Sequence, residues 1–582
     1  MKILLIYPPP WKIAPDQCPQ YSPGEGPPAN FDPEALRCLD FLQAPYGLLC
    51  IAAHARAKGL DVSVCNLADA EWPTIEQRVQ RWEADLFGFS CLTTNRRGTG
   101  MLAALVRKVH PQAHIVVGGP HVSALPVQTL AYWPAVDSVI IGEGEITFLD
   151  LVSRLKAGRG IAGLPGAAWR NGDRIEVGPP RARVRNLDQL TAPQTYFPMR
   201  TLITARGCPM ACTFCSSRAM WGRQVRSHSV EAVLDMLEAM VCRDGCRFVA
   251  IKDATFTADR KRILALCKEI CARKLPFFWG CDTRADCLDE TVIKTMRRAG
   301  CVRISLGVES AATTIRRNIK KHLSLDQVLE ATRTIKKFGI QVRYYLMVGN
   351  RGETMATFHE TLAFIDQAKP NQYVFSQLHL YPGTEEFQIF EKHGIVSPEI
   401  FFERDFFCLT CFAGQRTDEN RIRKMLYPIK GLQHCWSYPT GDRQRIQRRL
   451  PDDALAHIDL CRAYLRNGNA ARAERHLDLA LHYGYFLPDL AQNFRACVRA
   501  LQGDLINAAQ LLDQAAAHDP SAIVTENRRR LNQFIMREDA GKRHPLKLHI
   551  GDSFICDTQS ASPEFPDSGV NRHRQGLPID NY

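Results

Sequence analysis

The segment TARGCPMACTFCSS, residues 204–217, holds three cysteines, Cys208, Cys212 and Cys215, within eight residues. A structural zinc site is normally closed by four protein ligands, so three thiols would leave one position unfilled. Thiolates are soft ligands that suit iron–sulfur clusters, and a 4Fe-4S cluster held by only three of them keeps one iron open. The spacing therefore predicts a cluster with Cys208, Cys212 and Cys215 as ligands and room for a small molecule on the open iron.

The cysteines come directly after the first strand of a segment in which strands and helices alternate, residues 201–395. Its six predicted strands are β-rich apolar runs at 201–204, 247–252, 277–281, 302–306, 341–347 and 373–379. Six units are too few for a closed eight-fold barrel, but they are enough for an open, partial (β/α)6 TIM barrel. Because barrel chemistry collects at the C-terminal strand ends, the loop after the first strand suits a reactive site.

A second alternation of strands and helices comes before it, over residues 1–165. Five strands are predicted, at 2–7, 61–65, 86–90, 114–118 and 138–141. They favour a doubly wound, Rossmann-like (flavodoxin-like) α/β sheet, which binds ligands beyond the carboxyl ends of its strands. Those ends carry GGPHVSALP (118–126) and GEGE (142–145), whose glycines would let a large planar or phosphate-bearing group approach the backbone.

Two further segments are predicted to connect the larger units. Residues 166–200 form a linker that opens with a hairpin turning at Asn171 and Gly172. Residues 396–450 are irregular and rich in aromatic side chains, and we expect them to extend the barrel or to link it to the C-terminal region.

The C-terminal part of the chain is helical in pattern over residues 451–535. NGNAARAERHLDLAL (467–481) aligns with QGDLINAAQLLDQAA (502–516), so the pattern repeats after 502 − 467 = 35 residues. This resembles two degenerate tetratricopeptide repeats, a module that most often contacts other proteins. Residues 536–582 are polar with scattered Pro, Gly and Ser, which predicts a disordered tail.

The composition limits the functions that the chain can have. It has 582 residues, 45% hydrophobic and 23% charged, and no apolar run long enough to cross a bilayer. Because no export signal is recognisable, the 21 cysteines indicate a reducing, cytoplasmic setting. Much of the net charge of +13 lies outside the motifs, in 441–450, 526–531 and 541–544. Solvated helix faces explain it better than polyanion binding, so nucleic acid is not an expected partner.

The CxxxCxxC spacing, with Phe214 before the last cysteine, resembles the radical S-adenosylmethionine superfamily. The resemblance implies a 4Fe-4S cluster that binds and reductively cleaves S-adenosylmethionine. It also implies that Phe214, Asp253, Arg284 and Glu309 contact this cofactor from successive strand ends. Two departures are visible: Ala254 stands where a second acid is common, and Asn350–Arg351 replace an apolar–proline pair in the fifth-strand signature.

Residues 1–165 resemble the cobalamin-binding domain that precedes the barrel in one branch of this superfamily, which includes anaerobic magnesium-protoporphyrin cyclase and the phosphonate and hopanoid methylases. The resemblance implies cobalamin contacts for six residues of the two glycine-rich segments: Gly118, Gly119, His121, Gly142, Glu143 and Gly144. The DxHxxG element that supplies a cobalt ligand in some cobalamin proteins is absent. His121 is therefore either a cobalt ligand in a different context or a loop histidine, and in the second case cobalamin would have no protein histidine below the metal.

The resemblance implies an enzyme that methylates, or oxidatively rearranges, an unactivated carbon of a small-molecule substrate. It also implies an electron-donor protein such as flavodoxin or ferredoxin, while the helical repeats would hold a protein partner. Two alternatives remain: a radical methylthiotransferase acting on tRNA, and a non-catalytic cobalamin sensor or scaffold. Cys408 and Cys411 form a CxxC pair that would need another ligand to hold an auxiliary cluster.

Overall fold

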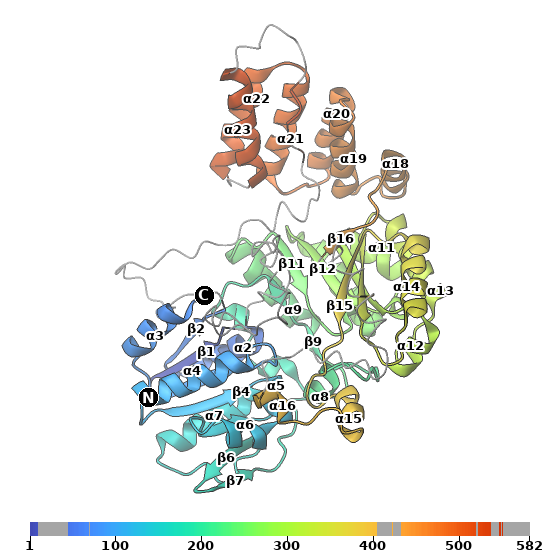
Figure 1. Ribbon diagram of the computed structural model, residues 1–582. Helices are drawn as coiled ribbons and strands as arrows, with labels where there is room; N and C mark the ends of the chain where they lie inside the picture. The colour runs from blue at the N-terminus through green and yellow to red at the C-terminus, as the bar shows by residue number, and fades with distance from the viewer. Residues whose placement is uncertain are drawn as a thin grey trace.

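The computed structural model describes residues 1–9, 45–68, 70–403, 422, 432–518, 522–536, 546–548 and 550. Two seven-stranded sheets succeed one another along the chain, and a group of helices lies beyond the second sheet (Figure 1). The predicted α/β class with a helical C-terminal region is confirmed. Across the described residues, no helix has both the length and the apolar character needed to cross a membrane.

The first sheet has the strand order β2-β1-β3-β4-β5-β6-β7, and its first five strands are parallel. Those five are β1 (Ile3–Tyr7), β2 (Val62–Asn66), β3 (Leu86–Ser90), β4 (His114–Gly118) and β5 (Ser138–Ile140). All five lie within two residues of the predicted runs. Strands that are covered on both faces are apolar along most of their length, so the sequence alone indicates them.

Helices cover both faces of this sheet. On one face pack α2 (Tyr46–Ala57) and α7 (Gly144–Lys156), which share a core with Leu5, Val64 and Val116. The other face carries α3 (Trp72–Arg81), α4 (Arg96–Val109) and α6 (Pro126–Tyr132), against the alternate strand residues. The short α5 (Pro120–Ala124) comes after β4 at the carboxyl end of the sheet.

The hairpin predicted in the linker joins the first sheet. Strands β6 (Ala167–Asn171) and β7 (Arg174–Val177) are antiparallel, and β6 pairs with β5. Asn171 pairs with Arg174, so the turn residues are Gly172 and Asp173, one position later than predicted. Burial of Ala167, Ala168 and Trp169 against the sheet accounts for its extension into the predicted linker.

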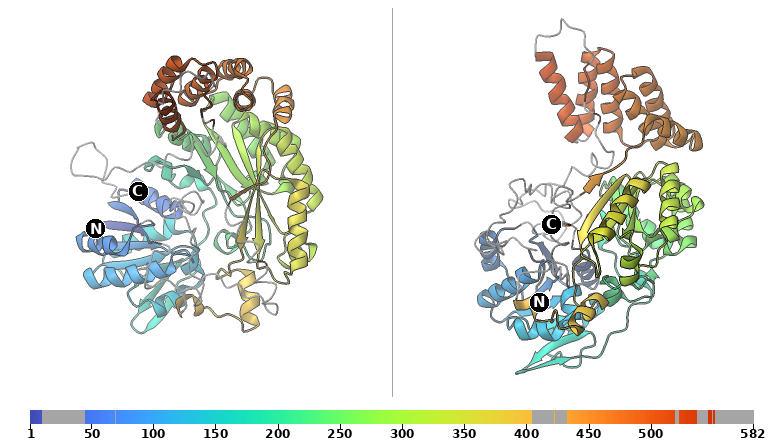
Figure 2. Two further views of the ribbon diagram at one scale, coloured as in Figure 1. Left: turned by 45° about the horizontal axis from the view of Figure 1, so that its top comes forward. Right: turned by 45° about the vertical axis from the view of Figure 1, so that its right-hand side comes forward.

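The second sheet has the order β16-β15-β14-β13-β12-β11-β8, which runs in chain order from β8 onward. Its parallel strands are β8 (Thr201–Leu202), β11 (Phe248–Ile251), β12 (Phe278–Thr283), β13 (Cys301–Glu309), β14 (Gln341–Val348) and β15 (Gln372–Gln377). An antiparallel strand, β16 (Leu432–His434), completes the edge. Figure 2 shows the helices gathered on the outer side of this curved sheet. The main ones are α9 (Val230–Glu238), α10 (Arg260–Arg273), α11 (Glu290–Arg298), α13 (Leu325–Lys337) and α14 (Met355–Ala368).

The helical C-terminal region packs on the end of the second sheet where the strands begin. It comprises α18 (Thr440–Arg449), α19 (Ala454–Arg466), α20 (Ala470–His482), α21 (Pro488–Leu501), α22 (Leu505–His518) and α23 (Ala522–Met536). Phe278 at the start of β12 meets Phe486, with ring centroids 4.5 Å apart, and Arg247 donates to the buried Asp489 at 2.9 Å. These helices are thus remote from the C-terminal strand ends. The predicted disordered tail lies outside the described residues, except for 536, 546–548 and 550.

Candidate functional site

The three clustered cysteines lie in a loop that leaves the second sheet directly after β8. A two-stranded ribbon closes this loop: β9 (Ala205–Arg206) pairs antiparallel with β10 (Arg226–Ser227). We call this ribbon the neck, and residues 207–216 the cysteine loop. Cys208, Cys212 and Cys215 are free thiols, each partly exposed, so the loop holds them accessible rather than in the core.

The number of clustered thiols, three, is one fewer than a closed structural zinc site takes. Among the described residues, no three His, Cys, Asp or Glu side chains are arranged to hold a single metal ion. A tetrahedral zinc with Zn–S bonds of about 2.3 Å needs sulfur atoms about 3.8 Å apart. Three soft thiolates suit an iron–sulfur cluster, in which each would bind a different iron, so the donor set fits such a cluster.

Thr213 fixes the middle of the cysteine loop. Its hydroxyl donates to Glu386 Oε2 at 2.6 Å, and its carbonyl accepts from the Glu386 backbone N–H at 2.9 Å. Glu386 is fully buried in the first turn of α15 (Glu385–Lys392), and it also accepts from Arg351 Nε at 2.7 Å. Arg351, one of the two departures from the family signature, therefore supports the loop through Glu386. Sequence reasoning missed Glu386 altogether.

Glu309 lies at the end of β13 in a strained backbone conformation. Its φ of 65° is in the left-handed region, and the pairing of β13 with β14 shifts register there. The carboxylate pairs with Lys321, Nζ to Oε1 3.2 Å, and a Cβ on Gly307 would lie 2.8 Å from that same oxygen. The ammonium of Lys321 lowers the pKa of the Cys212 thiol and the carboxylate of Glu309 raises it, so the fold brings Glu309 and the cysteine loop together. Strain of this kind clusters at functional sites.

Arg284 and Phe214 have different surroundings. Arg284 is buried and donates two hydrogen bonds to Asp286, at 2.9 and 2.8 Å, and one to the carbonyl of His322. Burial is the main effect on the pKa of the Cys212 thiol and raises it, whereas the guanidinium of Arg284 lowers it. We call the first sheet with its helices the first domain, and the second sheet with its helices the second domain. Phe214 packs against an apolar cluster that includes Leu125 of the first domain.

Asp253 supports the neck from the end of β11. It is buried and accepts from the backbone N–H and hydroxyl of Thr204, at 2.6 and 2.5 Å, and from the N–H of Ala205 at 3.1 Å. Burial raises its pKa to about 6, although these hydrogen bonds oppose the shift. Its carboxylate is thus occupied with the backbone that leads into the cysteine loop.

Glu353 is a buried carboxyl in the loop after β14 that should make stability depend on pH. It accepts from the N–H groups of Gly349 and Asn350, and burial raises its pKa to about 7. Between the ordinary glutamate pKa of 4.5 and the raised pKa of about 7, the folded chain keeps a proton that the unfolded chain releases, so stability falls as pH rises through that window. We expect Glu353→Gln to remove roughly 2 kcal/mol of this loss.

Thermal melts at about pH 4 and pH 8, on either side of that window, measure this difference, with Glu360→Gln on the exposed side of α14 as the control. The control should keep the pH dependence of the unmodified chain. An undiminished pH dependence in Glu353→Gln would contradict the assignment.

His121 is enclosed by aromatic side chains. Its Nδ1 lies 3.1 Å from Thr93 Oγ1, while Nε2 is buried with no hydrogen-bond partner among the described residues. The ring centroids of Phe401 and Phe402, from α16 (Ile400–Glu403), lie 5.4 and 6.0 Å away. Burial, followed by the effect of Arg96, lowers the pKa of His121 to about 3. A neutral imidazole with a free nitrogen is a competent ligand, but here its ring packs against Phe401 and Phe402.

The glycines of the two glycine-rich segments have different surroundings. A Cβ on Gly119, whose φ is 113°, would lie 2.5 Å from the carbonyl oxygen of Cys91, and one on Gly144 would lie 2.7 Å from Ile51. These two glycines allow close packing of the domain itself. Gly142 has no neighbour within 4 Å of such a Cβ and Gly118 meets only Ile140 at 3.8 Å, so these two leave space for a ligand.

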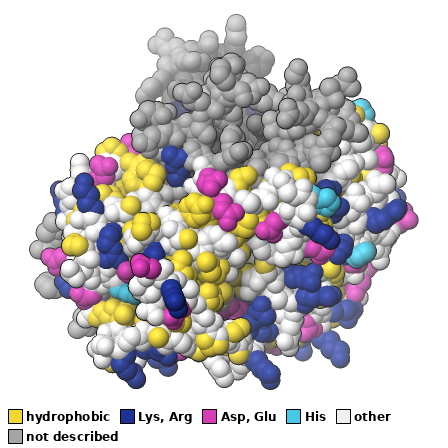
Figure 3. Space-filling view, turned by 60° about the horizontal axis from the view of Figure 1, so that its bottom comes forward, with side chains coloured by type: hydrophobic (Ala, Val, Ile, Leu, Met, Phe, Trp, Pro, Cys, Tyr) yellow, Lys and Arg dark blue, Asp and Glu magenta, His cyan; other side chains and the backbone are white. Residues whose placement is uncertain are grey.

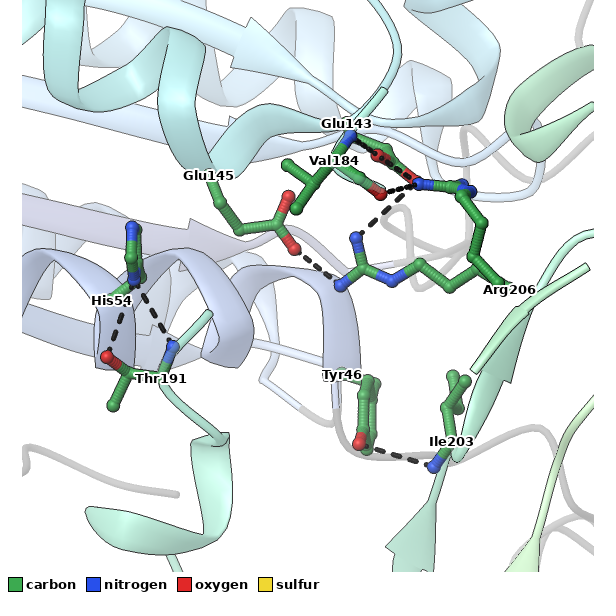
Figure 4. A network of polar contacts seen from close by, with 9 residues as sticks. Tyr46, His54, Glu143, Glu145, Val184, Thr191, Ile203 and Arg206 are labelled. Atoms are coloured by element: carbon green, nitrogen blue, oxygen red, sulfur yellow. Dashed lines mark hydrogen bonds and ion pairs between the residues drawn. The ribbon is translucent and has the colours of Figure 1, made fainter. Parts of the chain in front are cut away.

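Glu143 and Glu145 point at the neck of the cysteine loop (Figure 4). Glu143 accepts from both terminal nitrogens of Arg226, at 2.5 and 3.0 Å, and lies 3.6 Å from Arg206. Glu145 accepts from Arg206 at 2.5 Å. The resemblance implies a cofactor contact for Glu143, whereas here its carboxylate is engaged with the second domain. Cys408 and Cys411 lie outside the described residues.

Two segments of the chain match models of known families. Residues 202–365 match the model of the radical SAM superfamily, and residues 35–152 match that of the B12 binding domain. The segment that matches the B12 binding domain therefore precedes the one that matches the radical SAM superfamily.

The chain also resembles curated proteins and solved structures. An uncharacterized methyltransferase of Pyrococcus horikoshii is 29% identical over 58% of this chain and 77% of its own length. An anaerobic magnesium-protoporphyrin IX monomethyl ester cyclase of Rubrivivax gelatinosus is 28% identical over 56% of this chain and 63% of its own length. The radical S-adenosylmethionine methyltransferase TsrM of Kitasatospora setae, solved with cobalamin and a [4Fe-4S] cluster, has a TM-score of 0.54 at 17% identity, covering 67% of this chain and 78% of TsrM. The last comparison shows a common fold.

Proposed function

We propose that this chain, in which a B12 binding domain precedes a radical SAM domain, is a cobalamin-dependent radical SAM enzyme, a C-methyltransferase acting on a small molecule. The observation that carries the proposal is the three free thiols of the cysteine loop, in a domain of the radical SAM superfamily and beside Glu309 and Lys321. Both matched domains and the methyltransferase relatives support the same activity.

The cofactors implied are a 4Fe-4S cluster, S-adenosylmethionine and cobalamin. When bound, they supply reductive cleavage of S-adenosylmethionine, hydrogen abstraction from an unactivated carbon and methyl transfer. Cys208, Cys212 and Cys215 would hold the cluster as thiolates. Glu309 and Lys321 offer a carboxylate and an ammonium that match the amine and carboxylate of an amino acid, and Arg284, held by Asp286, adds a second cation.

Cobalamin would lie at the carboxyl end of the first sheet. The open space at Gly118 and Gly142 and the unpartnered Nε2 of His121 fit a large ligand there. The strand order β2-β1-β3-β4-β5 is the flavodoxin-like one, whose ligands bind at that end. His121 would ligate cobalt only after Phe401 moved away from it, so we favour cobalamin without a protein ligand below the metal.

The second sheet and the helical C-terminal region suit the same function. We interpret the six parallel strands in chain order as a partial (β/α)6 barrel, residues 201–395, with its chemistry at the C-terminal strand ends. The helices α19 to α22 pack as two successive antiparallel pairs, a pattern that suits tetratricopeptide-like repeats over residues 451–535 and a protein partner.

An electron-donor protein, a flavodoxin or ferredoxin, would reduce the cluster. Lys and Arg side chains gather on one side of the face shown in Figure 3. Exposed cations flank the cysteine loop on neighbouring elements: Arg218, Arg223, Arg317 and Lys320. An acidic electron carrier would be attracted to such a surface.

The two alternatives are less well supported. A methylthiotransferase that grips tRNA through a C-terminal β-barrel does not suit this chain, because residues 440–536 are helical wherever they form regular structure in the described part. A non-catalytic cobalamin sensor would have no use for three accessible thiols arranged to leave an iron open.

Anaerobic reconstitution with iron, sulfide and hydroxocobalamin tests the proposal. We expect an iron–sulfur absorption band, one bound corrinoid for each chain, and release of 5′-deoxyadenosine from S-adenosylmethionine on addition of a strong reductant. A chain that binds corrinoid but never consumes S-adenosylmethionine would instead favour the sensor.

A further inference from the structure

The neck of the cysteine loop carries two arginines directly opposite each other. Arg206 on β9 pairs in register with Arg226 on β10. Like charges in directly opposed positions destabilise an antiparallel pair. Both side chains are largely buried, 12% and 5% exposed, so water does little to screen their repulsion. Closure of the loop therefore depends on a source of negative charge.

That charge comes from the first domain. Glu143 and Glu145, which we call the acidic clasp, are 7% and 6% exposed and contact both arginines (Figure 4). Glu143 is the N-cap residue of α7 and Glu145 lies in its first turn, where carboxylates are favoured by the helix dipole. The positive end of the α7 dipole thus favours the ionised carboxylates that face the neck.

The clasp is part of a larger contact between the first domain and the neck. Tyr46, at the start of α2, accepts a hydrogen bond from the Ile203 N–H at 3.2 Å. A cavity of about 20 Å³, enough for one water, lies between Tyr46, Cys50, Glu145, Arg206 and His228. The packing of α7 on α2 at Gly144 fixes where the clasp stands.

We propose that Glu143 and Glu145 are positioning residues for the cysteine loop: by neutralising Arg206 and Arg226 they make closure of its neck depend on docking of the first domain. The significance of this dependence for a metal cluster rests on the proposed function. The positioning role of the two glutamates also explains why glycine and glutamate alternate in GEGE (142–145). The glycines shape the turn and the helix packing, while the glutamates face the neck. The neck lies two residues before Cys208, so a change at the clasp reaches the thiols directly.

The test uses the full-length chain and readouts that need no cofactor. Hydrogen exchange over residues 205–228, and iodoacetamide labelling of Cys208, Cys212 and Cys215 after iron chelation, report whether the loop is closed. We expect Glu143→Gln/Glu145→Gln to raise exchange and labelling rates about 10-fold or more. The single change Glu145→Gln should have a smaller effect in the same direction, and it serves if the double variant does not fold. The charge swap Glu145→Arg/Arg206→Glu should restore part of the protection.

Asp489→Asn is the matched control. It removes a fully buried carboxylate that pairs with Arg247 between the second sheet and the helical region, far from the neck. It should lower the melting temperature yet leave labelling of the three cysteines unchanged. Labelling at the rate of the unmodified chain in both clasp variants, or an equal rise in the control, would overturn the proposal. If Cys212→Ala retained S-adenosylmethionine cleavage, the proposed function would fail while this outcome still stood.

Discussion

Replacing Cys212 by alanine should abolish cleavage of S-adenosylmethionine by the reconstituted chain. A cluster held by two thiolates lacks the third ligand that fixes it to the loop, so iron is lost and no reduction takes place. We expect a rate at least about 1000-fold lower, equivalent to about 4 kcal/mol of activation free energy. The loop itself should survive, because Thr213 keeps its contacts with Glu386 and Ile319. Bound iron, the absorption band and 5′-deoxyadenosine release measure the effect.

Cys287→Ala provides the matched control for that experiment. Cys287 is a partly exposed free thiol beside Asp286, and it interacts electrostatically with Cys208, so it lies in the same region. It has no place in the CxxxCxxC spacing. We expect the variant to keep its iron and its activity. Loss of the cluster in Cys287→Ala together with its retention in Cys212→Ala would show that the ligand set is wrong.

The strands could be predicted because local sequence determines them. β1 is buried along its whole length, and a short apolar run bounded by Pro8 and Pro9 has few other interpretations. β6 and β7 were recognisable as a hairpin, but not as part of the first sheet. Which edge a hairpin joins depends on long-range packing, here of Ala168 and Trp169, and no local pattern encodes that.

A role could be proposed from sequence only for residues that carry their own chemistry. Three cysteines in one loop led to the prediction of a cluster, whereas a glutamate such as Glu143 is equally suited to a cofactor or to an arginine. The choice depends on a partner far away in the chain, in this case Arg226. The same reasoning applies to Arg351, which stood out as a departure from the family signature although nothing indicated its contact with Glu386.

Glu386→Ala should loosen the cysteine loop and lower the stability of the second domain by about 2–4 kcal/mol. The change leaves the Thr213 hydroxyl without its acceptor in a buried position and takes away the carboxylate that holds Arg351. Since Arg351 is 32% exposed, water can solvate part of its charge, which keeps the cost below that of a fully buried pair. Denaturant unfolding gives the stability, and iron retained after gel filtration gives the state of the loop.

The neighbouring Glu385 separates this effect from a general loss of charge on α15. Glu385 is 30% exposed and pairs with Lys320 and Arg218, which are themselves about half exposed, so Glu385→Ala should cost no more than about 1 kcal/mol and leave the iron content unchanged. Glu386→Gln keeps an acceptor for Thr213 but not the charge that holds Arg351. Its loss of stability should therefore lie between those of Glu385→Ala and Glu386→Ala. If Glu385→Ala and Glu386→Ala proved equally stable and equally rich in iron, the contacts of Glu386 would not stabilise the cysteine loop. The position of the three cysteines would then depend on the neck alone.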